Sequence, residues 1–148
     1  MKQLRILLAN DAQDDCLLFK EVLDGFHFPV SFSTVSNGEQ LLHILGKKKR
    51  LPHILFLDLN IPRKNGFDCL EEIKSNEKLK TLPVIIFSSS FDHDIVNMLY
   101  QKGAQCYIQK PSKYPKLKKA IHQALTLTLM GEFLQPEKEK FVISSIFI

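Results

Sequence analysis

The chain has 148 residues, of which 45% are hydrophobic and 24% charged, and its formal net charge is +4. This length fits one domain that buries roughly two-thirds of its unfolded surface without needing a disulfide or a structural metal. The three cysteines, Cys16, Cys69 and Cys106, include no CxxC pair and are expected to be buried thiols.

Hydropathy and charge exclude two classes of partner. The longest apolar runs fall far short of the ~20 residues that span a bilayer, and the N-terminus lacks a signal-peptide pattern, so we expect a cytoplasmic protein without membrane association. Basic residues gather at positions 47–50 and at Lys113, Lys116, Lys118 and Lys119. Tyr114 is the one aromatic residue among them and no recognition-helix motif is visible, so no nucleic-acid partner is expected.

The first part of the chain predicts a strand, a helix, a second strand and a second helix. Residues 4–9 form an apolar run, and the polar residues after it lead into a helix capped around residues 13–15 and stopped by Gly25. The apolar stripe of this helix is expected to be Leu17, Leu18, Val22 and Leu23. Residues 30–35 alternate and read as a strand with one exposed face, and a helix bearing Leu41, Leu42 and Leu45 follows Asn37.

The rest of the chain is organised around residues 53–66, where an apolar run ends at Asp58 and breaks into a turn. A run without polar alternation is typical of a strand buried on both faces of a parallel sheet. A helix follows Asn65-Gly66, residues 83–87 form another buried strand, and residues 92–101 a helix. Residues 105–109 alternate, as in an edge strand, and the last helix covers residues 114–130.

Five strands alternating with five helices predict a doubly wound α/β fold with a parallel sheet. We expect a domain over residues 1–130, followed by a polar linker at residues 131–140 and an apolar tail at residues 141–148. The tail fits either docking onto its own domain or pairing with the sheet edge of another chain.

Polar side chains stand at the carboxyl ends of the apolar strands, which meet at one edge of a parallel sheet. They are Asn10, Asp11, Asp58, Ser88 and Lys110. Two close carboxylates favour a hard divalent cation such as Mg²⁺, and a lysine beside a hydroxyl can hold an anionic oxygen. This set suits transfer of a phosphoryl group onto Asp58. Each residue also has a simpler explanation: a helix cap or turn for the aspartates, a turn for Ser88, and a solvated surface position for Lys110.

The chain resembles the receiver domains of response regulators in two-component signalling over about residues 4–127. The matching pieces are Asn10-Asp11, the segment 58–66, the segment 83–88, and the run Tyr107-Ile108-Gln109-Lys110-Pro111. The resemblance implies a flavodoxin-like sheet of strand order 2-1-3-4-5. It also implies a phosphoacceptor protein rather than an enzyme, served by a histidine kinase or a histidine phosphotransfer protein and acting on a downstream protein.

The resemblance further implies roles for individual residues. Asp58 would accept the phosphoryl group, and Asp11, Asp58 and the main-chain carbonyl of Asn60 would bind Mg²⁺. Ser88 and Lys110 would contact the phosphoryl oxygens, and rotation of Tyr107 would repack the face formed by the fourth helix, fifth strand and fifth helix. That face, or the tail, is also where a homodimer would form.

One position departs from the family pattern. Receivers usually carry two acids after the first strand, and here the first is Asn10, which offers a carbonyl oxygen to a metal-bound water but removes one negative charge. Weaker Mg²⁺ binding is therefore expected. The alternative is a binding module of the same fold that is never phosphorylated and signals by constitutive contact.

Two further alternatives come from other protein classes. A phosphatase of the haloacid dehalogenase type uses an acid two residues after its nucleophile, and this position is Asn60, which cannot donate the required proton. A flavodoxin-like flavin protein needs a Ser/Thr/Gly phosphate loop after the first strand, which the segment 10–15 lacks.

Overall fold

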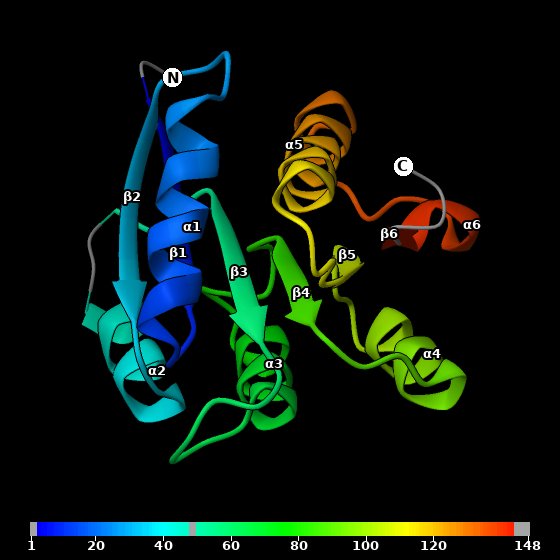
Figure 1. Ribbon diagram of the computed structural model, residues 1–148. Helices are drawn as coiled ribbons and strands as arrows, with labels where there is room; N and C mark the ends of the chain where they lie inside the picture. Colours follow the sequence, from blue (N-terminus) through cyan, green and yellow to red (C-terminus); the bar gives the residue numbers. More distant parts are fainter. Residues whose placement is uncertain (1–2, 48–49, 144–148) are drawn as a thin grey trace. The chain divides into compact units, whose positions relative to one another are not determined.

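The computed structural model describes residues 3–47 and 50–143. Lys48 and Lys49 of the first basic cluster, and residues 144–148 of the tail, lie outside this range. The chain divides into two compact units, Met1–Leu82 and Pro83–Ile148 (Figure 1).

The first unit contains three parallel strands with β1 in the middle. These are β1 (Leu4–Ala9), β2 (Val30–Val35) and β3 (Ile54–Asp58). In their register, Leu4 pairs with Val30 and Ile6 pairs with Ile54. The apolar residues of β1 and of β3 are all buried, as the hydrophobic runs predict.

Three helices alternate with these strands: α1 (Gln13–Asp24), α2 (Gly38–Lys47) and α3 (Gly66–Ser75). Asparagine caps two of them. The Asn65 side chain accepts a hydrogen bond from the backbone N–H of Asp68 at 2.9 Å, and the Asn37 side chain accepts one from that of Gln40 at 2.8 Å. Such caps satisfy backbone donors that the first turn of a helix leaves without partners.

The expected buried stripe of α1 is partly wrong. Leu17 is 62% exposed and Leu18 37% exposed, while Phe19 is buried together with Val22 and Leu23. The ring of Phe19 packs edge-on against Phe56, with centroids 4.7 Å apart. Burying this larger aromatic surface sets the rotation of the helix, and that rotation leaves the two leucines in solvent.

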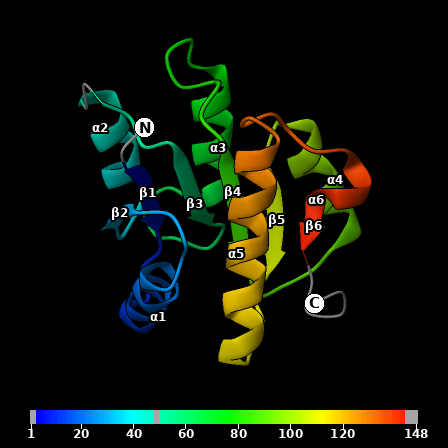
Figure 2. The same cartoon turned by 90° about the horizontal axis from the view of Figure 1, so that it is seen from above.

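The second unit contains the parallel strands β4 (Val84–Ser88), β5 (Cys106–Gln109) and β6 (Val142–Ile143). The strand order is β2-β1-β3 in the first unit and β4-β5-β6 in the second. Within each unit the order agrees with the expected 2-1-3-4-5, and β6 is an added strand. The expectation of an edge strand at residues 105–109 is therefore wrong, because β6 pairs with the outer side of β5 (Figure 2).

The helices of the second unit are α4 (His93–Gln101), α5 (Tyr114–Met130) and α6 (Lys138–Phe141). The Asp92 side chain caps α4 by accepting hydrogen bonds from two backbone N–H groups of its first turn. The sequence missed α6, which is four residues long and lacks an apolar period, so α5 is not the last helix and residues 131–140 are not purely a linker. No helix among the described residues is long and apolar enough to cross a bilayer.

Residues 135–143, which are the end of the expected linker and the start of the expected tail, dock on their own unit. The Tyr100 hydroxyl donates to the carbonyl of Pro136 at 3.2 Å, and the Gln135 amide donates to the carbonyl of Ala104 at 2.7 Å. Phe141 is buried, with its ring centroid 5.0 Å from that of Tyr100. Of the two alternatives for the tail, residues 141–143 follow the intramolecular one.

Candidate functional site

The ends of β1 and β3 bring three of the expected site residues to the same edge of the first unit. Ala9 of β1 pairs with Leu57 of β3, so Asn10 and Asp58 are the next residues along two neighbouring parallel strands. Asn10 is buried, Asp11 is exposed, and Asp58 is half-buried. Two carboxylates and one amide thus stand where a parallel sheet offers its ligand-binding edge.

Asn10 is held by a local hydrogen-bond network. Its side-chain oxygen accepts from the backbone N–H of Ala12 at 2.7 Å, and its side-chain nitrogen donates to Asp15 Oδ2 at 3.3 Å. The sequence analysis missed Asp15. The pattern that could have revealed it is an acid in the first turn of the helix that follows this strand, where the chain folds back over the strand end.

Asp58 is the last residue of β3, and the β3–α3 loop (residues 59–65) follows it. One of its carboxylate oxygens, Oδ1, accepts a hydrogen bond from the backbone N–H of Asn60 at 3.0 Å. This contact folds the loop back on the carboxylate and places Asn60, an exposed residue, next to Asp58. The loop ends where the backbone N–H of Gly66 donates to the carbonyl of Leu59 at 2.9 Å.

Ser88 and Lys110 lie together in the second unit, at the ends of β4 and β5. Ser88 pairs with Gln109 in the register, and the Lys110 N–H donates to the Ser88 carbonyl at 2.7 Å. The Ser88 hydroxyl is 3.2 Å from that of Ser90. The Lys110 ammonium lies 5.7 Å from the centre of the Phe87 ring, within cation–π range. A hydroxyl and an ammonium therefore share one end of this unit.

Tyr107 lies in β5 with its side chain turned inward. It is 1% exposed, and its hydroxyl donates a hydrogen bond to the carbonyl of Ser90. The Phe91 ring packs edge-on against it at 6.2 Å. Tyr107 and Ser88 thus both contact Ser90, so one short segment links the two residues that the sequence proposes as a switch.

The donor set in the first unit fits a hard cation with few protein ligands. Among residues 3–47 and 50–143, no three His, Cys, Asp or Glu side chains form a cluster able to hold a metal by themselves. Asp11, Asp58 and the main-chain carbonyl of Asn60 offer only oxygen atoms. Mg²⁺ is commonly bound through one or two carboxylates and keeps several of its waters, which matches this set.

Comparison with known proteins decides the family. The sequence profile of the response regulator receiver domain matches residues 6–122. The chain belongs to the response regulator receiver domain family. The receiver is 31% identical over 121 residues to the response regulator Rcp1 of Synechocystis, covering 78% of this chain and 82% of Rcp1. It is also 26% identical over 120 residues to the probable chemotaxis protein CheY of Rhizobium etli, covering 81% and 91% of the two chains.

Solved structures agree with this assignment. The Mn²⁺-bound form of Rcp1 matches the receiver with a TM-score of 0.77 at 29% identity, covering 84% of this chain and 94% of that one. The phosphorylated cyanobacterial phytochrome response regulator RcpA matches with a TM-score of 0.79 at 28% identity, covering 91% and 99%. The doubly wound fold class expected from the sequence is confirmed.

Proposed function

We propose that this receiver accepts a phosphoryl group on Asp58 from a histidine kinase or a histidine phosphotransfer protein, with Mg²⁺ as cofactor. The observation that carries the proposal is the placement of Asp58 beside Asn10 and Asp11 at the ends of two paired parallel strands. Two solved relatives support it: RcpA is phosphorylated in its structure, and Rcp1 holds Mn²⁺ in its own.

The proposed step is an in-line displacement. A carboxylate oxygen of Asp58 forms a bond to phosphorus, and the bond from phosphorus to the donor imidazole nitrogen breaks. The electron pair of that bond leaves with the imidazole, which is protonated as it departs. The product is an acyl phosphate on Asp58, and the chemistry needs positioning and charge neutralisation more than acid–base catalysis.

We assign Mg²⁺ to Asp11, Asp58 and the main-chain carbonyl of Asn60. When bound, the cation offsets the negative charge of the incoming phosphoryl oxygens. Asn10 is assigned a weak role through water, because it lacks the charge of a carboxylate and its side-chain oxygen already accepts the Ala12 N–H. We expect weaker metal binding than in receivers with two acids at this point.

We assign Ser88 and Lys110 to the phosphoryl oxygens and Tyr107 to the switch, by analogy with the family. Phosphorylation adds about 1.5 to 2 negative charges and three acceptor oxygens. A shift of Ser88 toward them would break its contact with Ser90, the residue that also accepts the Tyr107 hydroxyl. The two-state element that passes the change to a downstream protein is then the segment around Ser90.

The alternative function is a receiver-like module that binds its partner without phosphorylation, and Asn10 is the observation that favours it. Intact-mass measurement separates the two functions. The protein is incubated with Mg²⁺ and acetyl phosphate or phosphoramidate, beside a receiver known to be labelled. We expect the mass of one phosphoryl group on the wild-type chain and none on Asp58→Asn. An unmodified wild-type chain, with the reference receiver labelled, would favour the module.

A further inference from the structure

The β3–α3 loop rests directly on the first residue of α2. The backbone N–H of Gly38 donates to the carbonyl of Pro62 at 3.2 Å. A Cβ atom on Gly38 would lie 1.9 Å from the carbonyl oxygen of Lys64 and 2.7 Å from its Cβ, where real Cβ contacts stay above 3.0 Å. Only glycine permits so close an approach of two backbone segments.

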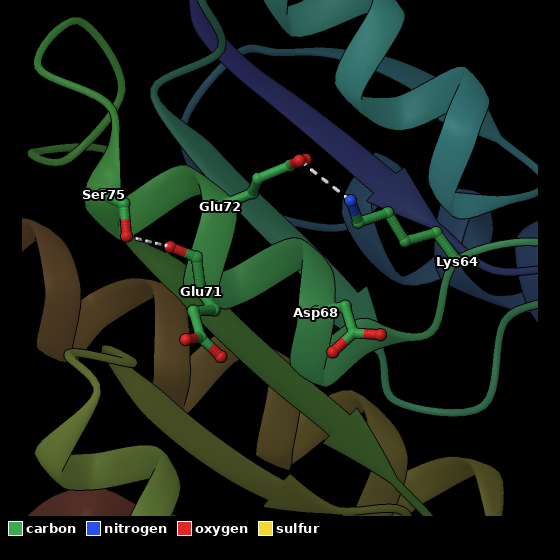
Figure 3. A pocket seen from close by; sticks show the side chains of 5 residues that line it. All are labelled: Lys64, Asp68, Glu71, Glu72 and Ser75. Carbon is green, nitrogen blue, oxygen red and sulfur yellow. Dashed lines mark hydrogen bonds and ion pairs between the residues drawn. The ribbon is translucent and has the colours of Figure 1, made fainter.

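Lys64 is also held from the side of α3. Its ammonium forms an ion pair with Glu72 at 2.8 Å across the pocket shown in Figure 3. The buried thiol of Cys69 lies 3.7 Å from the carbonyl oxygen of Lys64 and 3.8 Å from that of Gly38. Burial raises the pKa of this thiol to about 11, so it stays protonated and can donate its one hydrogen to either carbonyl. Lys64 is thus fixed between two helices.

The loop has little freedom to absorb a displacement of Lys64. The Pro62 carbonyl accepts the N–H of Lys64 at 2.8 Å, which closes a three-residue turn with Arg63 at a φ of 68°. A turn with this positive φ is tight and strained. Asn60 is tied to Asp58 at the other end of the same short loop. A displacement of Lys64 is therefore expected to shift the rest of the loop, including Asn60.

We infer that Gly38 is a positioning residue for the β3–α3 loop, and that its missing side chain keeps the Asn60 carbonyl where a cation on Asp58 would need it. The inference rests on the proposed function. To admit a side chain at position 38, the Lys64 carbonyl must retreat from 1.9 Å to at least 3.0 Å. Misplacing a catalytic or ligand group by about 1 Å can cost on the order of a hundredfold in rate.

The chain offers a matched control for Gly38→Ala. Gly46 lies in the same helix, and a Cβ built there meets nothing within 4 Å. Neither glycine has a positive φ. Three quantities are compared in wild type, Gly38→Ala and Gly46→Ala: the amide hydrogen exchange of residues 59–66, the dissociation constant for Mg²⁺ alone, and the rate of phosphoryl labelling by acetyl phosphate.

For Gly38→Ala we expect faster exchange across residues 59–66, at least roughly tenfold weaker Mg²⁺ binding and a comparable loss of labelling rate. Gly46→Ala should match wild type in all three. If Gly38→Ala has the same loop exchange, Mg²⁺ affinity and labelling rate as wild type, the inference is overturned and the proposed function stays intact.

A second pair of variants decides the inference if Gly38→Ala does not fold. Cys69→Ala removes the thiol from the junction of Gly38 and Lys64, and Cys106→Ala removes a buried thiol from β5. Compared with wild type, we expect faster amide exchange in residues 59–66 for Cys69→Ala and unchanged exchange for Cys106→Ala. Exchange as slow as that of wild type in both variants would overturn the inference.

The exchange measurement also keeps the inference separate from the proposed function. If wild type takes no phosphoryl group, the function fails, but faster loop exchange in Gly38→Ala would still support the positioning role of Gly38.

Discussion

The side-chain nitrogen of Asn10 donates a hydrogen bond to Asp15 Oδ2 across 3.3 Å. A carboxylate at position 10 would place two negative charges in this contact instead. Asn10 is also 2% exposed, so water would screen that repulsion only weakly. Compared with a carboxylate at position 10, the Asn10 amide offers a metal one negative charge fewer. In the metal-free protein the amide makes a stabilising contact with Asp15.

The substitution Asn10→Asp should lower the stability of the metal-free protein and raise its affinity for Mg²⁺. Without Mg²⁺, we expect the free energy of unfolding to fall by about 1 kcal/mol, because a donor facing Asp15 is lost and a like charge replaces it. Mg²⁺ binding should tighten, since one more carboxylate faces the cation. Denaturant unfolding with and without Mg²⁺, together with a metal titration, measures both effects.

The double variant Asn10→Asp/Asp15→Asn is the control. It restores a donor opposite position 10 and should recover the metal-free stability while keeping the tighter binding. Equal Mg²⁺ affinities in wild type and Asn10→Asp would contradict the importance given to this position.

The substitution Phe141→Ala tests whether the C-terminal segment belongs to the folded unit. Phe141 is 1% exposed and packs against Tyr100, so truncation should cost about 3 to 5 kcal/mol of unfolding free energy. Leu134→Ala, at a position 71% exposed in the same segment, should change little. Thermal or denaturant unfolding measures both. A similar small change for the two variants would show that residues 141–143 do not hold the unit together.

His53 should make stability depend on pH. Its Nδ1 accepts the backbone N–H of Arg5 at 2.9 Å, which a protonated ring cannot do. Burial lowers the pKa of His53 from its ordinary value of 6.5, and the charge of Arg5 lowers it further. The contribution of the neutral His53 ring to the free energy of unfolding is therefore complete above about pH 6.5. It is lost as the pH falls toward the pKa of His53 in the folded state.

The measurement is the free energy of unfolding between pH 7 and pH 5. The slope from one proton reaches at most about 1.4 kcal/mol per pH unit. His53→Asn keeps an acceptor that does not titrate and should flatten the curve, while His43→Asn, at an exposed position, should not. A wild-type slope that persists in His53→Asn would assign the pH dependence to other groups.

The strands were predictable because their apolar runs leave few other structures possible. The run ending at Asp58 is buried as expected, and Asn65 and Asp92 begin helices at the expected points. The rotation of α1 about its axis was not predictable from spacing alone, because Leu17 and Leu18 compete with Phe19 for the buried face. Strand β6 escaped prediction because two paired residues carry no periodicity.

The candidate site residues were predicted because polar residues at the carboxyl ends of parallel strands meet at one edge of the sheet. Their local contacts could not be predicted in this way. Asn10 and Asp58 follow paired positions, and Ser88 and Lys110 share a backbone hydrogen bond. The link from Ser90 to both Ser88 and Tyr107 depends on how one loop folds, and the role of Gly38 depends on how closely two backbones approach. Neither is encoded in residue spacing.

The central claim is that Asp58 is the phosphoacceptor, and locating the acyl phosphate tests it most directly. The wild-type receiver is treated with Mg²⁺ and phosphoramidate, reduced with borohydride to convert an aspartyl phosphate to homoserine, and digested for peptide mass spectrometry. We predict homoserine at position 58 and aspartate at positions 11 and 15. Homoserine at another aspartate, or none while a reference receiver is converted, would contradict this account.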